Sequence, residues 1–488
     1  MALLDQLHHI RQSLSGIFPE LFLVVFFLSA LLCELFLHKQ DQPQEPRKAI
    51  PVLHFCGAVI WLGLLIVQWY TGERGMLFGQ MIQLDDKSIF LKILLAAAWL
   101  ATLFHIRFLG YKFQPEIYAL LASAVLGAGL LCMASNLLTL YLSIELISLS
   151  SYLLVSLSPY PKASEGGLKY LLFGGVSSAI MLYGISLVYG LTGSLDINPE
   201  MWAPLYEASP LVLHVTILLT LGGLLFKLSL IPFHIWTPDT YEAAPTPIIS
   251  FLSAVPKIAV LLALYRVVAA LPAGVLPVIG GIALISMTAG NAGALWQTNA
   301  RRLMAYSTIA QAGYLITGIA AFGSTGFHTA VFYLSAYVLL SMSAFLLIDR
   351  FVPQSDGSFS LFNGKGSAWI AGGIALTIVM VGLAGFPPTV GFTGKWLVFS
   401  ALWDKYTASG ERWMFILLAG GILNAAISLA YYMKLPYLLF FKTTVPQASS
   451  SPSGRYGRSD VLVAVSILLL TVFLFFRPEA LMDVISKL

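Results

Sequence analysis

Hydrophobic residues form long, nearly unbroken runs along the whole chain, and short polar connections separate them. A run of about 20 apolar residues is long enough to cross a hydrocarbon core of roughly 30 Å as an α-helix. The pattern therefore predicts an all-α, polytopic membrane protein in which 1–488 form a single membrane domain. The predicted spans, about fourteen, are 16–38, 50–70, 88–109, 115–134, 136–158, 166–192, 208–231, 244–270, 273–297, 302–322, 326–350, 368–404, 411–441 and 459–477.

Two of the predicted spans are interrupted by proline. The first break lies in KLSLIPFHIWTPDTYEAAPTP, and the second lies in LAGFPPTVGFTGKW. Lipid cannot satisfy the backbone groups that such breaks release, so broken helices require surrounding protein or a polar cavity. Each break also lies beside a lysine, which favours paired repeats that each contribute one broken helix.

Composition and charge narrow the class of protein. The chain is 58% hydrophobic and 10% charged, whereas soluble domains carry about 25% charged residues. The net charge of +4 is scattered without a polybasic cluster, so nucleic acid is not an expected partner. Cys33, Cys56 and Cys132 stand singly, which gives no indication of an iron–sulfur cluster or a disulfide framework. Without a phosphate-binding loop, a dinucleotide fingerprint or clustered metal ligands, we expect no cofactor on this chain.

Four of the ionisable residues within predicted spans form a set spread through both halves of the chain, and a charge near the bilayer centre costs at least about 2.5–3.5 kcal/mol. Glu145 is near the middle of the fifth span, Lys227 precedes the first break, Lys257 is in the eighth span and Lys395 follows the second break. A lysine keeps its proton beside a carboxylate and releases it in a desolvated site, so this set predicts proton transport. The alternatives are lysine stems that extend to the membrane surface and, for Glu145, a static ion pair.

The same residues suggest how a proton could move. Opening and closing a Glu145–Lys227 pair would switch the lysine between holding and releasing, because two charges 4 Å apart attract by about 4 kcal/mol at an effective dielectric of 20. The helix dipole would favour charge on Lys227 and disfavour it on Lys395, which predicts loading at the first and discharge at the second. His234 is either a proton relay or a structural hydrogen-bonding histidine, and Lys169 is either part of an uptake path or an ordinary loop lysine.

Three motifs, ELISL, FKLSLIPFHIWTPDTYEAAPTP and GFTGKW, resemble the antiporter-like subunits of respiratory complex I. The likeness covers nearly the whole chain and is greatest to the subunit N type of NADH-quinone oxidoreductase. Lys395 favours that type over subunit M, which has a glutamate at the corresponding position. No long lateral helix follows the fourteenth predicted span, which argues against subunit L. The resemblance implies fourteen helices and two inverted five-helix repeats, 115–270 and 273–441, each with one broken helix.

By the same resemblance, Glu145 and Lys227 correspond to the family's ion pair, Lys257 to its central lysine and Lys395 to its terminal site, with His234 and Lys169 as flanking polar residues. Pro256, directly before Lys257, departs from the expected pattern and should loosen the preceding helical turn.

The resemblance also implies a proton-translocating membrane-arm subunit of an NADH:quinone oxidoreductase, a translocase driven by quinone reduction elsewhere. FMN, iron–sulfur clusters and quinone would then belong to partner subunits, and subunits M, K and J would be its neighbours in the bilayer. The distribution of Lys and Arg between connections puts both termini outside, which in a bacterial inner membrane is the periplasmic side. A subunit of a multi-subunit Na⁺/H⁺ antiporter or of a membrane-bound hydrogenase, and a passive membrane scaffold, remain alternatives.

Overall fold

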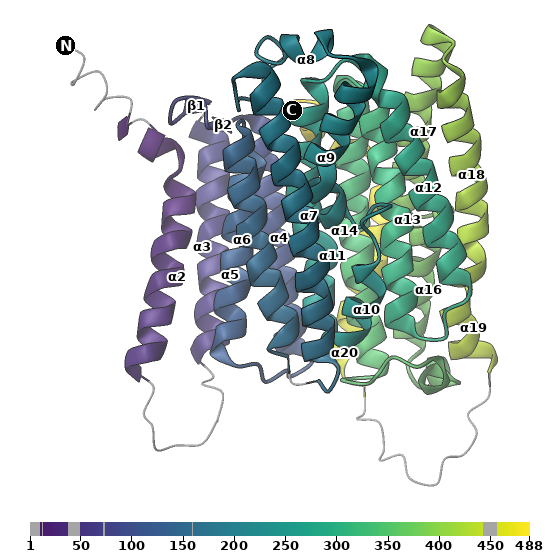
Figure 1. Ribbon diagram of the computed structural model, residues 1–488. Helices are drawn as coiled ribbons and strands as arrows, with labels where there is room; N and C mark the ends of the chain where they lie inside the picture. The colour runs from purple at the N-terminus through teal and green to yellow at the C-terminus, as the bar shows by residue number, and fades with distance from the viewer. Residues whose placement is uncertain (1–9, 12, 38–48, 72–73, 159, 443–455) are drawn as a thin grey trace. The chain divides into compact units, whose positions relative to one another are not determined.

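The computed structural model describes residues 10–11, 13–37, 49–71, 74–158, 160–442 and 456–488, and helices make up most of them (Figure 1). Within this part of the chain, eleven helices are long and apolar enough to cross a membrane. Each predicted span overlaps a helix or a pair of short helices. The prediction of a polytopic all-α membrane protein is confirmed, while the count of fourteen crossings stays a prediction.

The chain divides into two compact units. Unit 1 contains Met1–Leu228 and Ala254–Val275, and unit 2 contains Ser229–Ser253 and Leu276–Leu488. The two predicted repeats, 115–270 and 273–441, meet close to the boundary between Val275 and Leu276. That the two repeats have inverted topologies stays a prediction.

Unit 1 is built from long helices and one small hairpin. Strands β1 and β2 pair antiparallel, with Met76 opposite Gln83. Asp85 and Ser88 form a capping box that starts α4, and the Asn136 side chain caps α6 by accepting from the Leu138 N–H. The elements are α2 (Phe18–Leu37), α3 (Ala49–Thr71), β1 (Gly75–Leu77), β2 (Ile82–Leu84), α4 (Asp86–Phe108), α5 (Pro115–Met133), α6 (Leu137–Ser156), α7 (Ala163–Thr192), α8 (Ala203–Glu207), α9 (Pro210–Leu228), most of α11 (Thr246–Ala269) and η1 (Ala273–Val275).

Unit 2 contains the remaining helices. Asn299 caps α13 by accepting from the N–H groups of Arg301 and Arg302. The elements are α10 (Trp236–Ala243), the start of α11, α12 (Leu276–Leu295), α13 (Ala300–Ala320), α14 (Ser324–Phe351), η2 (Phe359–Phe362), α15 (Lys365–Ala368), α16 (Ile370–Ala384), α17 (Val390–Ser409), α18 (Arg412–Tyr432), α19 (Lys434–Phe441), α20 (Arg458–Phe476) and α21 (Glu479–Ile485).

Both predicted helix breaks are present. The first separates α9 from α10, and the chain leaves α9 through Ser229 in a left-handed conformation (φ 62°). The second separates α16 from α17, where Gly385 caps α16 at φ 86°. Pro256 does not add a third break, since α11 continues through it.

Candidate proton pathway

Lys227 lies in the last turn of α9, at the helix end that the sequence predicted. Its side chain is buried, and its Nζ donates a hydrogen bond to the Tyr170 hydroxyl at 3.3 Å. The Nζ also lies 5.3 Å from the ring centroid of Tyr152, 5.1 Å from that of Tyr170 and 5.6 Å from that of Phe226. These three rings form an aromatic cage, and all three distances are within the range at which a cation is attracted to a ring face.

Glu145 lies half-buried on α6 and accepts a hydrogen bond from Ser178 on α7. Among the described residues its carboxylate makes no direct ion pair with Lys227, although its charge acts on the lysine at longer range. The contact between Glu145 and Lys227 is not formed in this structure, and their role as a switching ion pair stays a prediction. Lys227 is held by the aromatic cage, and Glu145 is held by a serine.

Lys395 lies near the start of α17, and its buried Nζ is bound by the end of the preceding half-helix. It donates to the carbonyls of Ala384 at 2.8 Å and Leu383 at 3.2 Å, and it lies 4.2 Å from the ring centroid of Tyr314. The last carbonyls of α16 form its negative dipole end, which stabilises a cation. The expectation that the dipole disfavours charge on Lys395 is therefore wrong, and the predicted grading from Lys227 to Lys395 loses its electrostatic basis.

The other three candidate residues lie in different surroundings. Lys257 is 1% exposed on α11 and belongs to unit 1, as Lys227 does. His234 belongs to unit 2 and precedes α10, and its buried Nδ1 has no hydrogen-bond partner within the described part of the chain. Lys227 belongs to unit 1 and His234 to unit 2, and a relay from one to the other stays a prediction. Lys169 is 41% exposed and pairs with Glu165 one helical turn away at 2.9 Å, which is the arrangement of a surface lysine; its role in an uptake path also stays a prediction.

A buried polar network reaches Lys395 in unit 2, and the sequence analysis missed it. Gln311 on α13 donates to the Leu383 carbonyl at 2.7 Å, so it shares that acceptor with Lys395. The Gln311 amide also donates to the Tyr432 hydroxyl at 2.8 Å and accepts from Tyr333. In a linear sequence, tyrosine and glutamine on apolar helices give no signal that they will meet.

Two arginines hold α10, the second half of the first broken helix, within unit 2. Arg302 on α13 contacts Asp239 and Glu242 of α10, each at 2.8 Å. Arg301 donates to the Ala244 carbonyl, which follows the last turn of α10. The short helix is thereby fixed by charge as well as by packing. The sequence analysis noted the motif that contains Asp239 and Glu242. It could not identify Arg302 as the partner of these two residues.

Comparisons with known proteins agree with this fold. Residues 134–423 match the family described as "NADH:quinone oxidoreductase/Mrp antiporter, TM". The NADH-quinone oxidoreductase subunit N 2 of Chloroherpeton thalassium is 34% identical, over 96% of this chain and 93% of the relative. Subunit N of Heliobacterium modesticaldum is 37% identical over 87% of this chain and 89% of the relative.

Solved structures share the fold of this chain. A chain of respiratory complex I from Thermus thermophilus superposes with a TM-score of 0.79 at 28% identity and covers 95% of this chain and 98% of its own length. A chain of the Mrp complex from Dietzia sp. shares the fold, with a TM-score of 0.82 at 18% identity over 98% of this chain and 96% of its own. The chain therefore belongs to the NADH:quinone oxidoreductase/Mrp antiporter family of multi-pass membrane proteins, which includes relatives named subunit N of NADH-quinone oxidoreductase.

Proposed function

We propose that this chain is a proton-translocating membrane-arm subunit of a complex I-type NADH:quinone oxidoreductase and that it carries out no redox chemistry itself. The observation that carries the proposal is the placement of a buried lysine beside each helix break, Lys227 and Lys395. The names of relatives at 34% and 37% identity support the choice of complex. In this proposal Glu145, Lys257, His234 and Lys169 complete the set of proton-handling residues.

The aromatic cage explains how Lys227 could move at low cost. A desolvated cation on an aromatic face gains about 2 kcal/mol, and a contact ion pair with Glu145 would gain about 4 kcal/mol at an effective dielectric of 20. The two positions then differ by only about 2 kcal/mol. A conformational signal of that size from the rest of the complex would shift Lys227 from one position to the other.

A proton released by Lys395 would need water to reach the hydroxyl groups of Tyr333 and Tyr432, which can both donate and accept. The Leu383 carbonyl that Lys395 shares with Gln311 only accepts, so it passes no proton on. Entry of water between the lysine and these hydroxyl groups would open this route. The shared Leu383 carbonyl holds Lys395 and Gln311 next to each other. In this scheme the charge on Lys395 is stabilised by the end of α16 until the route opens.

The assembled protein would place this chain in a bacterial plasma membrane with both termini on the periplasmic side. Its neighbours would be antiporter-like subunit M and the small subunits K and J, and other subunits would hold FMN, iron–sulfur clusters and quinone. The second candidate is a subunit of a cation antiporter, which the shared fold with the Mrp complex supports. Membrane-bound hydrogenase and passive-scaffold roles have no comparable observation in their favour.

The decisive experiment is purification of the intact complex, followed by replacement of Lys227 with alanine. We expect co-purifying flavin and iron–sulfur subunits, and a variant that assembles and oxidises NADH but moves fewer protons per electron. Co-purification with antiporter subunits alone would assign the chain to the cation antiporters. A Lys227→Ala complex that assembles poorly but pumps normally per complex would assign it to the scaffolds.

A further inference from the structure

A buried ion pair lies among the first helices of unit 1 and includes none of the residues considered above. Glu20 on α2 and Lys92 on α4 are joined by a 2.9 Å contact, with side chains 2% and 0% exposed. The Lys92 Nζ also donates to the Gln68 side-chain oxygen on α3 at 3.1 Å and contacts the Met133 sulfur at the end of α5 at 3.4 Å. Four helices therefore meet at one charged site.

Packing alone does not account for this pair. Removing two charges from water costs several kcal/mol per ion, and apolar residues of similar volume often stabilise a fold as well or better. A charged group at membrane depth is expensive for the same reason. A site with this cost is a candidate for a task that needs charge.

The contacts around Glu20 leave one position open for a proton. Its Oε1 is bound by Lys92, whereas its buried Oε2 has no hydrogen-bond partner among the residues that the structure describes. The Gln68 side-chain nitrogen donates one of its two N–H groups to the Gly16 carbonyl at 2.8 Å. A proton on Oε2 would therefore disturb no existing bond. Lys92 would keep Gln68 and Met133 as partners if Glu20 became neutral.

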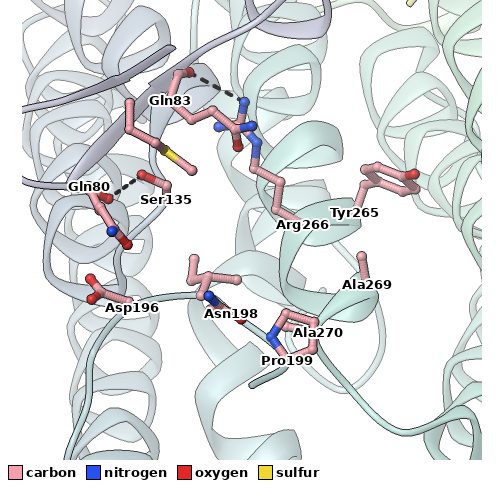
Figure 2. Close-up of a pocket in the computed structure, with 12 residues that line it drawn as sticks. Gln80, Gln83, Ser135, Asp196, Asn198, Pro199, Tyr265, Arg266, Ala269 and Ala270 are labelled. Carbon is pink, nitrogen blue, oxygen red and sulfur yellow. Dashed lines mark hydrogen bonds between the residues drawn. The ribbon is translucent and has the colours of Figure 1, made fainter. Parts of the chain in front are cut away.

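A cavity of about 330 Å³ opens close to this site on the side of the β-hairpin (Figure 2). Met133 contacts Lys92. Ser135, which lies two residues after Met133 in the chain, lines the cavity. Arg266 also lines it and donates to the carbonyls of Cys132 and Ala134 on either side of Met133, each at 3.0 Å. Arg266 is further paired with Asp85 at 3.0 Å, so these two nearby charges compensate each other.

We propose that the Glu20–Lys92 pair is a proton-exchanging site served by this cavity. Water in the cavity would deliver a proton to Glu20 Oε2, which changes the site from a neutral pair to a neutral acid beside a charged lysine, and the reverse step would return the proton to water. Met133 contacts Lys92 and packs in an apolar cluster with Leu77, Leu84 and Ile89. For water to reach the pair, Met133 would have to move, which its flexible, unbranched side chain permits.

Infrared difference spectra of the purified intact complex, recorded between two pH values without turnover, test this proposal. We expect a carboxylic-acid C=O band on acidification that Glu20→Gln removes and Lys227→Ala leaves in place. Lys92→Met should make the band appear at a pH at least one unit higher, because the neighbouring positive charge is gone.

Identical spectra for the wild type and Glu20→Gln across the accessible pH range would overturn the proposal, as would a band that Lys92→Met does not shift. If Glu20→Gln does not assemble, the double variant Glu20→Gln/Lys92→Met can replace it, because it leaves no unpaired buried charge. This double variant should also lack the band. If it keeps the band, the proposal is overturned. Because the spectra require no pumping, the outcome is independent of the proposed transport function.

Discussion

The contact between Gly385 and Lys395 provides a direct way to displace the proposed terminal proton carrier. Gly385 has φ 86°, and a Cβ at this position would lie 2.5 Å from Lys395 Cδ and 3.1 Å from its Cε. Carbon atoms prefer about 3.5–4.0 Å, so Gly385→Ala would push the lysine stem away by about 1 Å. The bonds from Nζ to Leu383 and Ala384, at 3.2 and 2.8 Å, would then be stretched or broken.

The expected size of the effect follows from those bonds. A hydrogen bond to a charged group contributes about 1.5–3 kcal/mol, so losing one would change the balance between held and released Lys395 by about 10- to 100-fold. We expect Gly385→Ala to assemble and oxidise NADH but to move fewer protons per electron. The assay is the quenching of a pH-sensitive dye in proteoliposomes, normalised to NADH oxidised.

Gly410→Ala is the matched control. Gly410 caps α17 with φ 71°, and a Cβ there would meet nothing within 4 Å. Both substitutions carry the left-handed backbone cost of about 1–2 kcal/mol, but only Gly385→Ala displaces Lys395. Equal proton-to-electron ratios for the two variants would refute the reasoning, because backbone strain would then explain the whole effect.

Three further predictions rest on separate contacts. Tyr170→Phe keeps a cage ring but removes the hydroxyl that accepts from Lys227, so proton transport should fall less than in Lys227→Ala; wild-type transport would contradict the role of the hydroxyl. Gly184→Ala would place a Cβ 2.2 Å from the backbone of α9 and should lower the thermal midpoint of the complex, whereas Gly175→Ala meets nothing within 4 Å and should leave it unchanged. Arg302→Met should cost about 1 kcal/mol or less per lost ion pair, given their partial exposure; the loss in thermal midpoint should shrink in high salt, and a salt-independent loss would point to packing instead.

Much of the fold could be predicted because each signal was local. Apolar runs predicted the helices, and the proline-rich segments predicted both breaks, since neither property depends on distant residues. The cost of a charge in lipid singled out Lys227 and Lys395 before any partner was known. The error over Lys395 was of another kind. The sequence placed it at the start of its own half-helix, but the long side chain reaches back to the end of the other one.

The sequence by itself therefore determined the membrane class, the helix positions, the breaks and the buried lysines, because hydrophobicity and backbone chemistry act over a few neighbouring residues. Only the tertiary structure decided which groups surround each charge. In the aromatic cage, the hydrogen bond from Lys227 to Tyr170 joins residues 57 positions apart in the sequence. The hydrogen bond from Lys92 to Glu20 joins residues 72 positions apart. The energy of a buried charge depends on the groups within a few ångströms of it, and packing between helices, rather than any local pattern, brings those groups together.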